Sequence, residues 1–230
     1  MYFNYYLLGI VVLPGILLAI YAQSLVNSTF NKYSVIASNN GRSAHEIARH
    51  FLDVAGLHGI QITRVGGSLT DYYNHRKKIL ALSETVYDST SISAIGVACH
   101  EVGHALQFKS NYLPIKIRNF IIPICNFVNK FVWIFVIFGA IFYYTNLIWI
   151  GAISFALSVL VNLVTLPVEF NASKRAIQLL RDSETFTEEE IDATKKVLNA
   201  AALTYLAGFI VSLLNLLRFV LAILMSRRRD

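Results

Sequence analysis

Charged side chains are scarce in this sequence. Of its 230 residues, 15% are Asp, Glu, Lys or Arg and 55% are hydrophobic, whereas soluble domains carry about 25% charged residues. The shortage is uneven, because long uncharged stretches alternate with polar ones. The composition therefore argues against an ordinary soluble protein and indicates membrane spans beside a polar portion.

Cysteine is nearly absent, and a nucleic-acid motif is missing. Cys99 and Cys125 are too few for a disulfide framework. Cys99 precedes a histidine and could be a thiolate ligand, but we favour a small buried side chain on a helix. The net charge of +6 comes without an aromatic and basic RNA motif. In a chain with apolar spans, excess Lys and Arg indicates membrane topology and anionic lipid, so no nucleic acid is expected as a partner.

Four apolar stretches approach or exceed the roughly 20 residues that cross a bilayer. They are residues 5–22, 119–144, 147–166 and 200–225. The first lacks a positive leading region and a clear cleavage site, so we expect an uncleaved anchor rather than a signal peptide. The second and third are separated only around Thr145-Asn146 and are expected to form a tight hairpin. The fourth contains Asn215 and Arg218, which are costly at mid-bilayer, so it is either transmembrane or partly interfacial.

Local signals in the polar portion predict a small α+β domain. The expected elements are a helix from 44 to 55, a strand from 60 to 65, a turn at 71–74, a strand from 79 to 82 and a helix capped by Ser91 or Ser93. Ser43 and Glu46 have the spacing of a capping box, as do Thr187 and Glu190. The strand at 79–82 is either an inner strand or an open edge on which an extended peptide could pair.

One motif in an apolar, helix-compatible run carries most of the chemical information. His100 and His104 are four residues apart, so on a helix both imidazoles lie on one face and can reach one metal ion. Glu101 is turned by about 100° around that helix, where a carboxylate can take a proton from water at the metal. This H-E-x-x-H pattern predicts the helix of a zinc hydrolase. The alternative is a helix with two histidines satisfied by the core.

A third ligand is needed, because catalytic zinc usually has three protein ligands. It must lie on the same side of the membrane as the two histidines. The predicted hairpin returns the chain to the side from which it entered, and Glu169 is the first carboxylate after the hairpin. We therefore predict Glu169 as the third ligand. The alternative is an interfacial charge at a helix end.

Several segments together resemble a known family. They are residues 67–73, 82–83, 91–95, 100–107 and 169–176. They resemble the YugP-like neutral zinc metallopeptidases, a membrane family with motifs related to those of the HtpX and CAAX-processing proteases. The resemblance covers nearly the whole chain. It implies a gluzincin-type site in which His100, His104 and Glu169 bind Zn²⁺ and Glu101 is the general base.

The chain departs from the family pattern at two positions beside the expected site. The wider group has an Asp that orients a ligand histidine, and Ser173 occupies that position here. The YugP-like pattern often has Asp where this chain has Asn171. A metal-bound histidine usually donates its other N–H to a carboxylate, carbonyl or water, so the partners of the imidazoles are left open.

Other residues near the motifs have ordinary alternatives. Candidate donors to a reaction oxyanion are Arg175, Tyr72, Tyr73 and His75, and for each of them a surface or packing role is the favoured interpretation. The remaining histidines, His45, His50 and His58, are interpreted in the same way.

We therefore predict a mainly α membrane protein, with about four transmembrane helices and a small α+β zincin-like catalytic domain. The predicted boundaries are 1–22 for the anchor, 23–118 for the catalytic domain with the zinc helix, 119–166 for the hairpin, 167–199 for the third-ligand segment and a connecting helix, and 200–230 for a transmembrane or interfacial helix with a basic tail.

The predicted function is a membrane-embedded zinc endopeptidase with Zn²⁺ as cofactor, acting on a peptide or protein substrate, membrane proteins included. The alternatives are a non-hydrolytic membrane metal-binding or scaffold protein and a small transporter or channel. The latter is disfavoured because ionisable residues cluster outside the spans. The other partner is the lipid bilayer, and no oligomeric state is indicated.

The expected location is the cell membrane, with several passes and the site on the cytoplasmic side. Basic residues near the spans favour this side; they are Lys109, Lys116, Arg118, Lys174, Arg175, Lys195 and Lys196. The basic tail at 227–229 argues for the reverse unless the fourth span is only half inserted.

Overall fold

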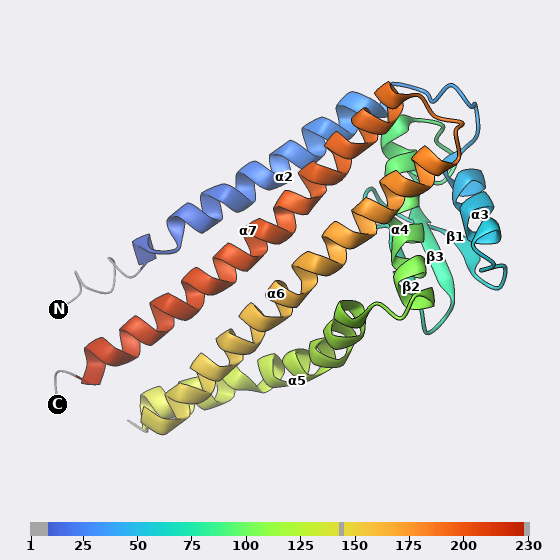
Figure 1. Cartoon of the computed structure of the whole chain (residues 1–230). Helices are drawn as coiled ribbons and strands as arrows, with labels where there is room; N and C mark the ends of the chain where they lie inside the picture. Colours follow the sequence, from blue (N-terminus) through green and yellow to red (C-terminus); the bar gives the residue numbers. More distant parts are fainter. Residues whose placement is uncertain (1–8, 143–144, 228–230) are drawn as a thin grey trace. The chain divides into compact units, whose positions relative to one another are not determined.

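The computed structural model describes residues 9–142 and 145–227. Its helices are α2 (Leu13–Ser34), α3 (Ala44–Val54), α4 (Ile92–Lys109), α5 (Leu113–Ile141), α6 (Thr145–Asp182) and α7 (Glu188–Arg227), and its strands are β1 (Gln61–Val65), β2 (Tyr72–Asn74) and β3 (Ile79–Ser83) (Figure 1). Among the described residues, α2, α5, α6 and α7 are long and apolar enough to cross a membrane. The predicted fold class, mainly α with four such helices and a small α+β region, is confirmed.

Parts of three predictions lie outside the described residues. They are the start of the first span at 5–8, the end of the second span at 143–144 and the tail at 228–230. The described chain divides into two compact units. The membrane unit comprises Met1–Ala22, Pro114–Pro167 and Thr204–Asp230, and the polar unit comprises Gln23–Leu113 and Val168–Leu203.

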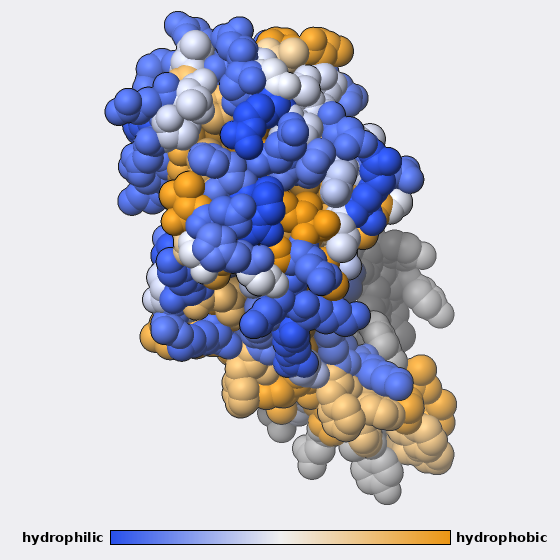
Figure 2. Space-filling model, turned by 90° about the vertical axis from the view of Figure 1, so that its right-hand side faces the viewer, coloured by the Kyte–Doolittle hydropathy of each residue, from blue (hydrophilic) through white to orange (hydrophobic). Residues whose placement is uncertain are grey.

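The membrane unit exposes apolar side chains, and several of its polar side chains are hydrogen-bonded. In α5 and α6, the Asn129 Oδ1 atom accepts a hydrogen bond from the Ser154 hydroxyl at 2.5 Å, and its Nδ2 donates to the Cys125 sulfur at 3.3 Å. Asn215 donates to the Val211 carbonyl within α7 at 2.9 Å, which reduces the cost of its amide in a bilayer. On the face that Figure 2 shows, hydrophobic side chains gather at the lower end of the view. Such a surface suits lipid rather than water.

The sheet of the polar unit has the strand order β1-β3-β2. β3 pairs in parallel with β1 and antiparallel with β2. Residues 80–83 of β3 are buried, so this strand is the inner one and the alternative of an open edge is wrong. Because it is covered on both faces, it is a continuous apolar run followed by one buried serine, Ser83.

The turn predicted at 71–74 is wrong. Tyr72–Asn74 is the edge strand β2, with Tyr73 opposite Leu80 of β3. Two neighbouring tyrosines favour a pleated strand once a partner is present. The chain instead reverses at residues 75–78, where Lys78 has a φ of 52°.

Both helices beside the sheet begin at the residues that the sequence indicates. At the start of α3, the Ser43 backbone N–H donates to Glu46 Oε2 at 2.8 Å, as a capping box requires. At the start of α4, the Ser91 hydroxyl oxygen accepts from the Ala94 N–H at 3.3 Å, so Ser91 is the cap. α3 ends at Val54, and Gly56, which follows the C-cap residue Ala55, has a φ of +67° that favours glycine.

α6 continues without interruption past Pro167, from the membrane unit into the polar unit. Proline inside a helix removes one backbone hydrogen bond, and α6 nevertheless runs through this position. The continuation places Glu169 and Ser173 four residues apart on one helix, where their side chains lie on the same face.

α4 and α6 touch backbone to backbone at Gly103, between the two motif histidines. A Cβ atom added there would lie 2.5 Å from the Ala172 carbonyl oxygen and 3.2 Å from the Ala172 Cα atom. Only a residue without a side chain fits this contact. The glycine therefore lets Glu169 approach the histidines from a separate helix.

We expect Gly103→Ala to lower the melting temperature of the detergent-solubilised protein by about 3–10 °C, since overpacking against rigid backbone costs about 1–3 kcal/mol. The matched control is Gly59→Ala, where an added Cβ would meet nothing within 4 Å. Equal melting temperatures for the two variants would contradict the close approach.

Candidate metal centre

The structure brings the three predicted metal ligands together in the polar unit. The Nε2 atom of His100 lies 3.2 Å from Glu169 Oε2, and the Nε2 atom of His104 lies 3.5 Å from the same oxygen. The two imidazole rings meet edge to face, with centroids 4.8 Å apart. Glu169 is 2% exposed, so its carboxylate faces the imidazoles rather than solvent.

The spacing of these donor atoms fits a zinc ion. Two ligand atoms at about 2.0–2.2 Å from a tetrahedral centre are about 3.3–3.5 Å apart. The two contacts of Glu169 Oε2, at 3.2 and 3.5 Å, agree with that separation. Two imidazole nitrogens and one carboxylate oxygen are also a donor set that catalytic zinc uses.

Glu101 lies beside this cluster on α4. A donor atom of Glu101 lies within 4.8 Å of donor atoms of both histidines. The carboxylate oxygen that lies within 3.5 Å of both Nε2 atoms is nevertheless that of Glu169. Burial raises the pKa of Glu101, although the two histidines oppose the shift. A raised pKa suits a carboxylate that accepts a proton and returns it.

Each imidazole has a neutral partner at its other nitrogen. The Nδ1 atom of His100 lies 3.1 Å from the Ser173 hydroxyl, so the serine at the family's Asp position does contact a ligand histidine. The Nδ1 atom of His104 lies 3.0 Å from Oε1 of Gln107. The sequence analysis missed Gln107, although its position three residues after His104 on the same helix could have indicated it.

The candidate oxyanion donors have other contacts in the described part of the chain. Arg175 lies at the carboxyl end of α4, where it donates to the Ser110 hydroxyl at 2.9 Å. His75 stacks on Phe108 with ring centroids 4.2 Å apart, and Tyr73 packs on the same ring at 5.8 Å. The fourth candidate, Tyr72, is on the edge strand and exposed.

Cys99 belongs to the core. Its side chain is fully buried among the apolar residues of the polar unit. Burial raises the pKa of the Cys99 thiol, so a thiolate is disfavoured there.

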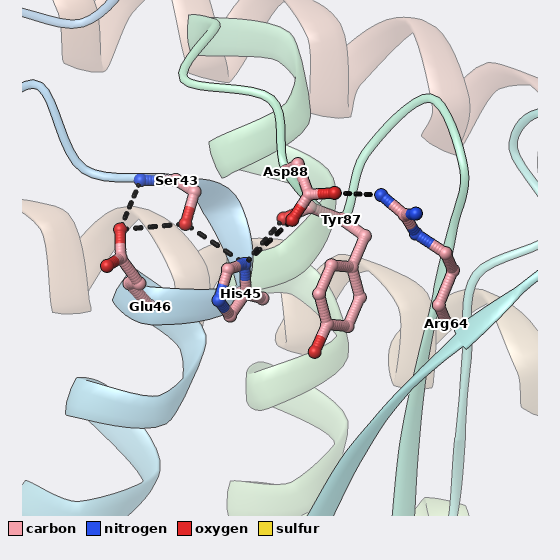
Figure 3. Close-up of polar contacts among 6 residues, drawn as sticks. All are labelled: Ser43, His45, Glu46, Arg64, Tyr87 and Asp88. Carbon is pink, nitrogen blue, oxygen red and sulfur yellow. Dashed lines mark hydrogen bonds and ion pairs between the residues drawn. The ribbon is translucent and has the colours of Figure 1, made fainter.

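A separate cluster of one serine, one histidine and one aspartate has the composition of a catalytic triad but not its geometry. Figure 3 shows His45 between Ser43 and Asp88. Both contacts reach the same Nδ1 atom, at 3.0 Å from the Ser43 hydroxyl and 3.7 Å from the Asp88 carboxylate. A triad needs its nucleophile and its carboxylate on opposite ring nitrogens. His45 also stacks on Tyr87, and Arg64 pairs with Asp88, so the cluster ties α3 to the loop before α4.

Comparison with known proteins identifies the family. Residues 8–224 match the family described as "Putative neutral zinc metallopeptidase". The chain belongs to this family. It is similar to a protein of Bacillus subtilis (strain 168) named "Putative membrane protease YugP", with 44% identity over 210 residues, which cover 91% of this chain and 93% of the relative. The resemblance stated from the sequence is thereby confirmed. No solved structure matches the chain.

We expect Glu169→Ala to lower the zinc content of the purified protein from about one ion per chain to a small fraction, because a two-histidine site lacks the usual third ligand. Elemental analysis measures the content, and the membrane fraction shows that the variant still inserts. The control is Glu188→Ala, since the Glu188 side chain is 72% exposed. Full zinc occupancy in Glu169→Ala would remove Glu169 from the ligand set.

Proposed function

We propose that this protein is a zinc-dependent endopeptidase of the membrane. His100, His104 and Glu169 hold the ion, and Glu101 is the general base. The observation that carries the proposal is the convergence of Glu169 Oε2 on both Nε2 atoms, beside a second, buried carboxylate. Membership of a zinc metallopeptidase family supports it.

The chemistry is the addition of water across a peptide bond. A zinc ion held by His100, His104 and Glu169 would lower the pKa of water towards 7 and polarise the scissile carbonyl. Glu101 accepts a proton as the water oxygen attacks the carbonyl carbon, and it then donates that proton to the amine nitrogen as the C–N bond breaks. The carboxylate ends the cycle in its starting form. The substrate is a peptide or protein, and the four apolar helices favour a membrane protein.

We expect Glu101→Gln to retain zinc and to cleave an unfolded, casein-like substrate about 100- to 10,000-fold more slowly, because the amide cannot accept the proton. A chelator should abolish the activity of the unmodified protein, and added zinc should restore it. Glu188→Gln is the matched surface control.

Two outcomes would overturn the peptidase proposal. One is equal cleavage by Glu101→Gln and the unmodified protein. The other is no cleavage by either protein although both contain zinc, which would favour a non-hydrolytic metal-binding or scaffold protein.

We also propose that the site faces the cytoplasm. If all four candidate helices cross the membrane, both ends of the chain would lie on one side and the metal site on the other. Basic residues beside the spans of the polar unit, such as Lys109, Lys174 and Lys195, favour the cytoplasm for that unit.

Alkaline phosphatase fused after Asp230 should therefore be active, since it folds only after export, and a green fluorescent protein fused at the same point should stay dark. The basic residues at 227–229 favour the opposite orientation. The reverse pattern of reporter activity would place the site outside the cytoplasm.

A further inference from the structure

Gln107 links His104 to α6 from a fully buried position. The side chain is 0% exposed. Its Nε2 atom donates to the Val168 carbonyl at 2.7 Å and to Asn171 Oδ1 at 3.1 Å. Its Oε1 atom lies 3.0 Å from His104 Nδ1. All of these contacts lie within the polar unit.

The direction of each hydrogen bond follows from neighbouring groups that can only donate or only accept a hydrogen. A backbone carbonyl only accepts, so the amide nitrogen of Gln107 must face Val168. An arginine only donates, and the Arg175 Nε atom lies 2.8 Å from Asn171, so the oxygen of Asn171 must face Arg175. That oxygen then also accepts from Gln107.

The amide oxygen of Gln107 is therefore turned to His104. An amide oxygen only accepts, so the Nδ1 atom of His104 must carry the hydrogen. The lone pair of the neutral imidazole is then on Nε2, the atom that faces Glu169 Oε2 at 3.5 Å.

The far end of this chain of contacts is anchored at the end of α4. Arg175 donates to the Leu106 carbonyl at 3.4 Å and to the Ser110 hydroxyl at 2.9 Å. A cation at the carboxyl end of a helix also meets its negative dipole. His100 differs, because the Ser173 hydroxyl beside its Nδ1 atom can either donate or accept and does not by itself select a tautomer.

We propose that Gln107 is a positioning residue that holds His104 in the Nδ1–H tautomer, with its amide oriented by Asn171 and Arg175. This inference rests on the metal site of the proposed function. Without the amide, a neutral His104 could carry its hydrogen on Nε2, in the place of the metal. Groups that orient a ligand histidine typically change metal affinity by about 10- to 100-fold.

The first test is zinc affinity, measured by competition with a chelator. We expect Gln107→Met, which preserves length and apolar packing, to raise the zinc dissociation constant about 10- to 100-fold. The matched control is Gln178→Met, because Gln178 is exposed on α6, where its amide nitrogen donates to Asp182 Oδ1. The control should stay within about twofold of the unmodified protein. An unchanged dissociation constant in a folded Gln107→Met variant would overturn the proposal.

The second test reads the tautomer directly, in zinc-free protein labelled with ¹⁵N-histidine. At a pH high enough that the ¹⁵N shifts of His104 no longer change, its imidazole is neutral, and these shifts, assigned by their loss in His104→Asn, should show Nδ1–H. In Gln107→Met they should show a mixture of tautomers. A purely structural role would not change this signature. An Nε2–H tautomer in the unmodified protein would overturn the proposal.

A conservative pair at Asn171 keeps the proposal testable if Gln107→Met does not fold. Asn171→Asp retains an acceptor oxygen for both Gln107 and Arg175, and should keep the tautomer and the zinc affinity. Asn171→Leu removes that acceptor and should lower both the zinc affinity and the share of the Nδ1–H tautomer of His104. Equal behaviour of the two variants would count against the proposal. Neither measurement uses peptide cleavage, so an inactive peptidase would leave this inference standing.

Discussion

The proposed metal centre depends on the close approach of α4 and α6 at Gly103. Two helices that carry ordinary side chains at a contact keep their axes about 8–10 Å apart, whereas here a Cβ atom would already meet the Ala172 carbonyl oxygen at 2.5 Å. One helix supplies both imidazoles and the other supplies the carboxylate. The glycine in the motif is thus a steric requirement, and the apolar packing around it, which includes Val102 and Ala176 with no exposed surface, keeps the helices in register.

The same packing buries the charge of the Glu169 carboxylate, and the neighbouring imidazoles compensate part of that cost. A carboxylate buried as deeply as that of Glu169 is unfavourable unless charges or hydrogen bonds compensate it. Two imidazoles within 3.5 Å provide part of this compensation, and a dication among the three side chains would provide more. Behind the imidazoles, Ser173 and Gln107 satisfy the outward-facing nitrogens without adding charge. The site is therefore a hydrogen-bonded group of polar side chains surrounded by buried apolar residues.

The sequence was sufficient wherever the physics is local or topological. Helical periodicity predicted His100 and His104 on one face, and the expected return of the hairpin pointed to Glu169 as their neighbour. The sequence-based prediction failed where a residue's structure or role depends on partners that are distant in the sequence. Tyr72–Asn74 became a strand because β3 was available as a partner. The role of Gln107 depends on carbonyl and amide groups of α6, more than 60 residues later in the chain.

The central claim is that Glu169 completes the ligand set begun by the two histidines. Anomalous diffraction at the zinc absorption edge, from crystals of the zinc-loaded protein, tests it most directly. The account predicts a single strong peak at about 2.0–2.2 Å from His100 Nε2, His104 Nε2 and a carboxylate oxygen of Glu169. A peak bound by the histidines with Glu169 beyond bonding distance, or a peak elsewhere in the chain, would contradict it.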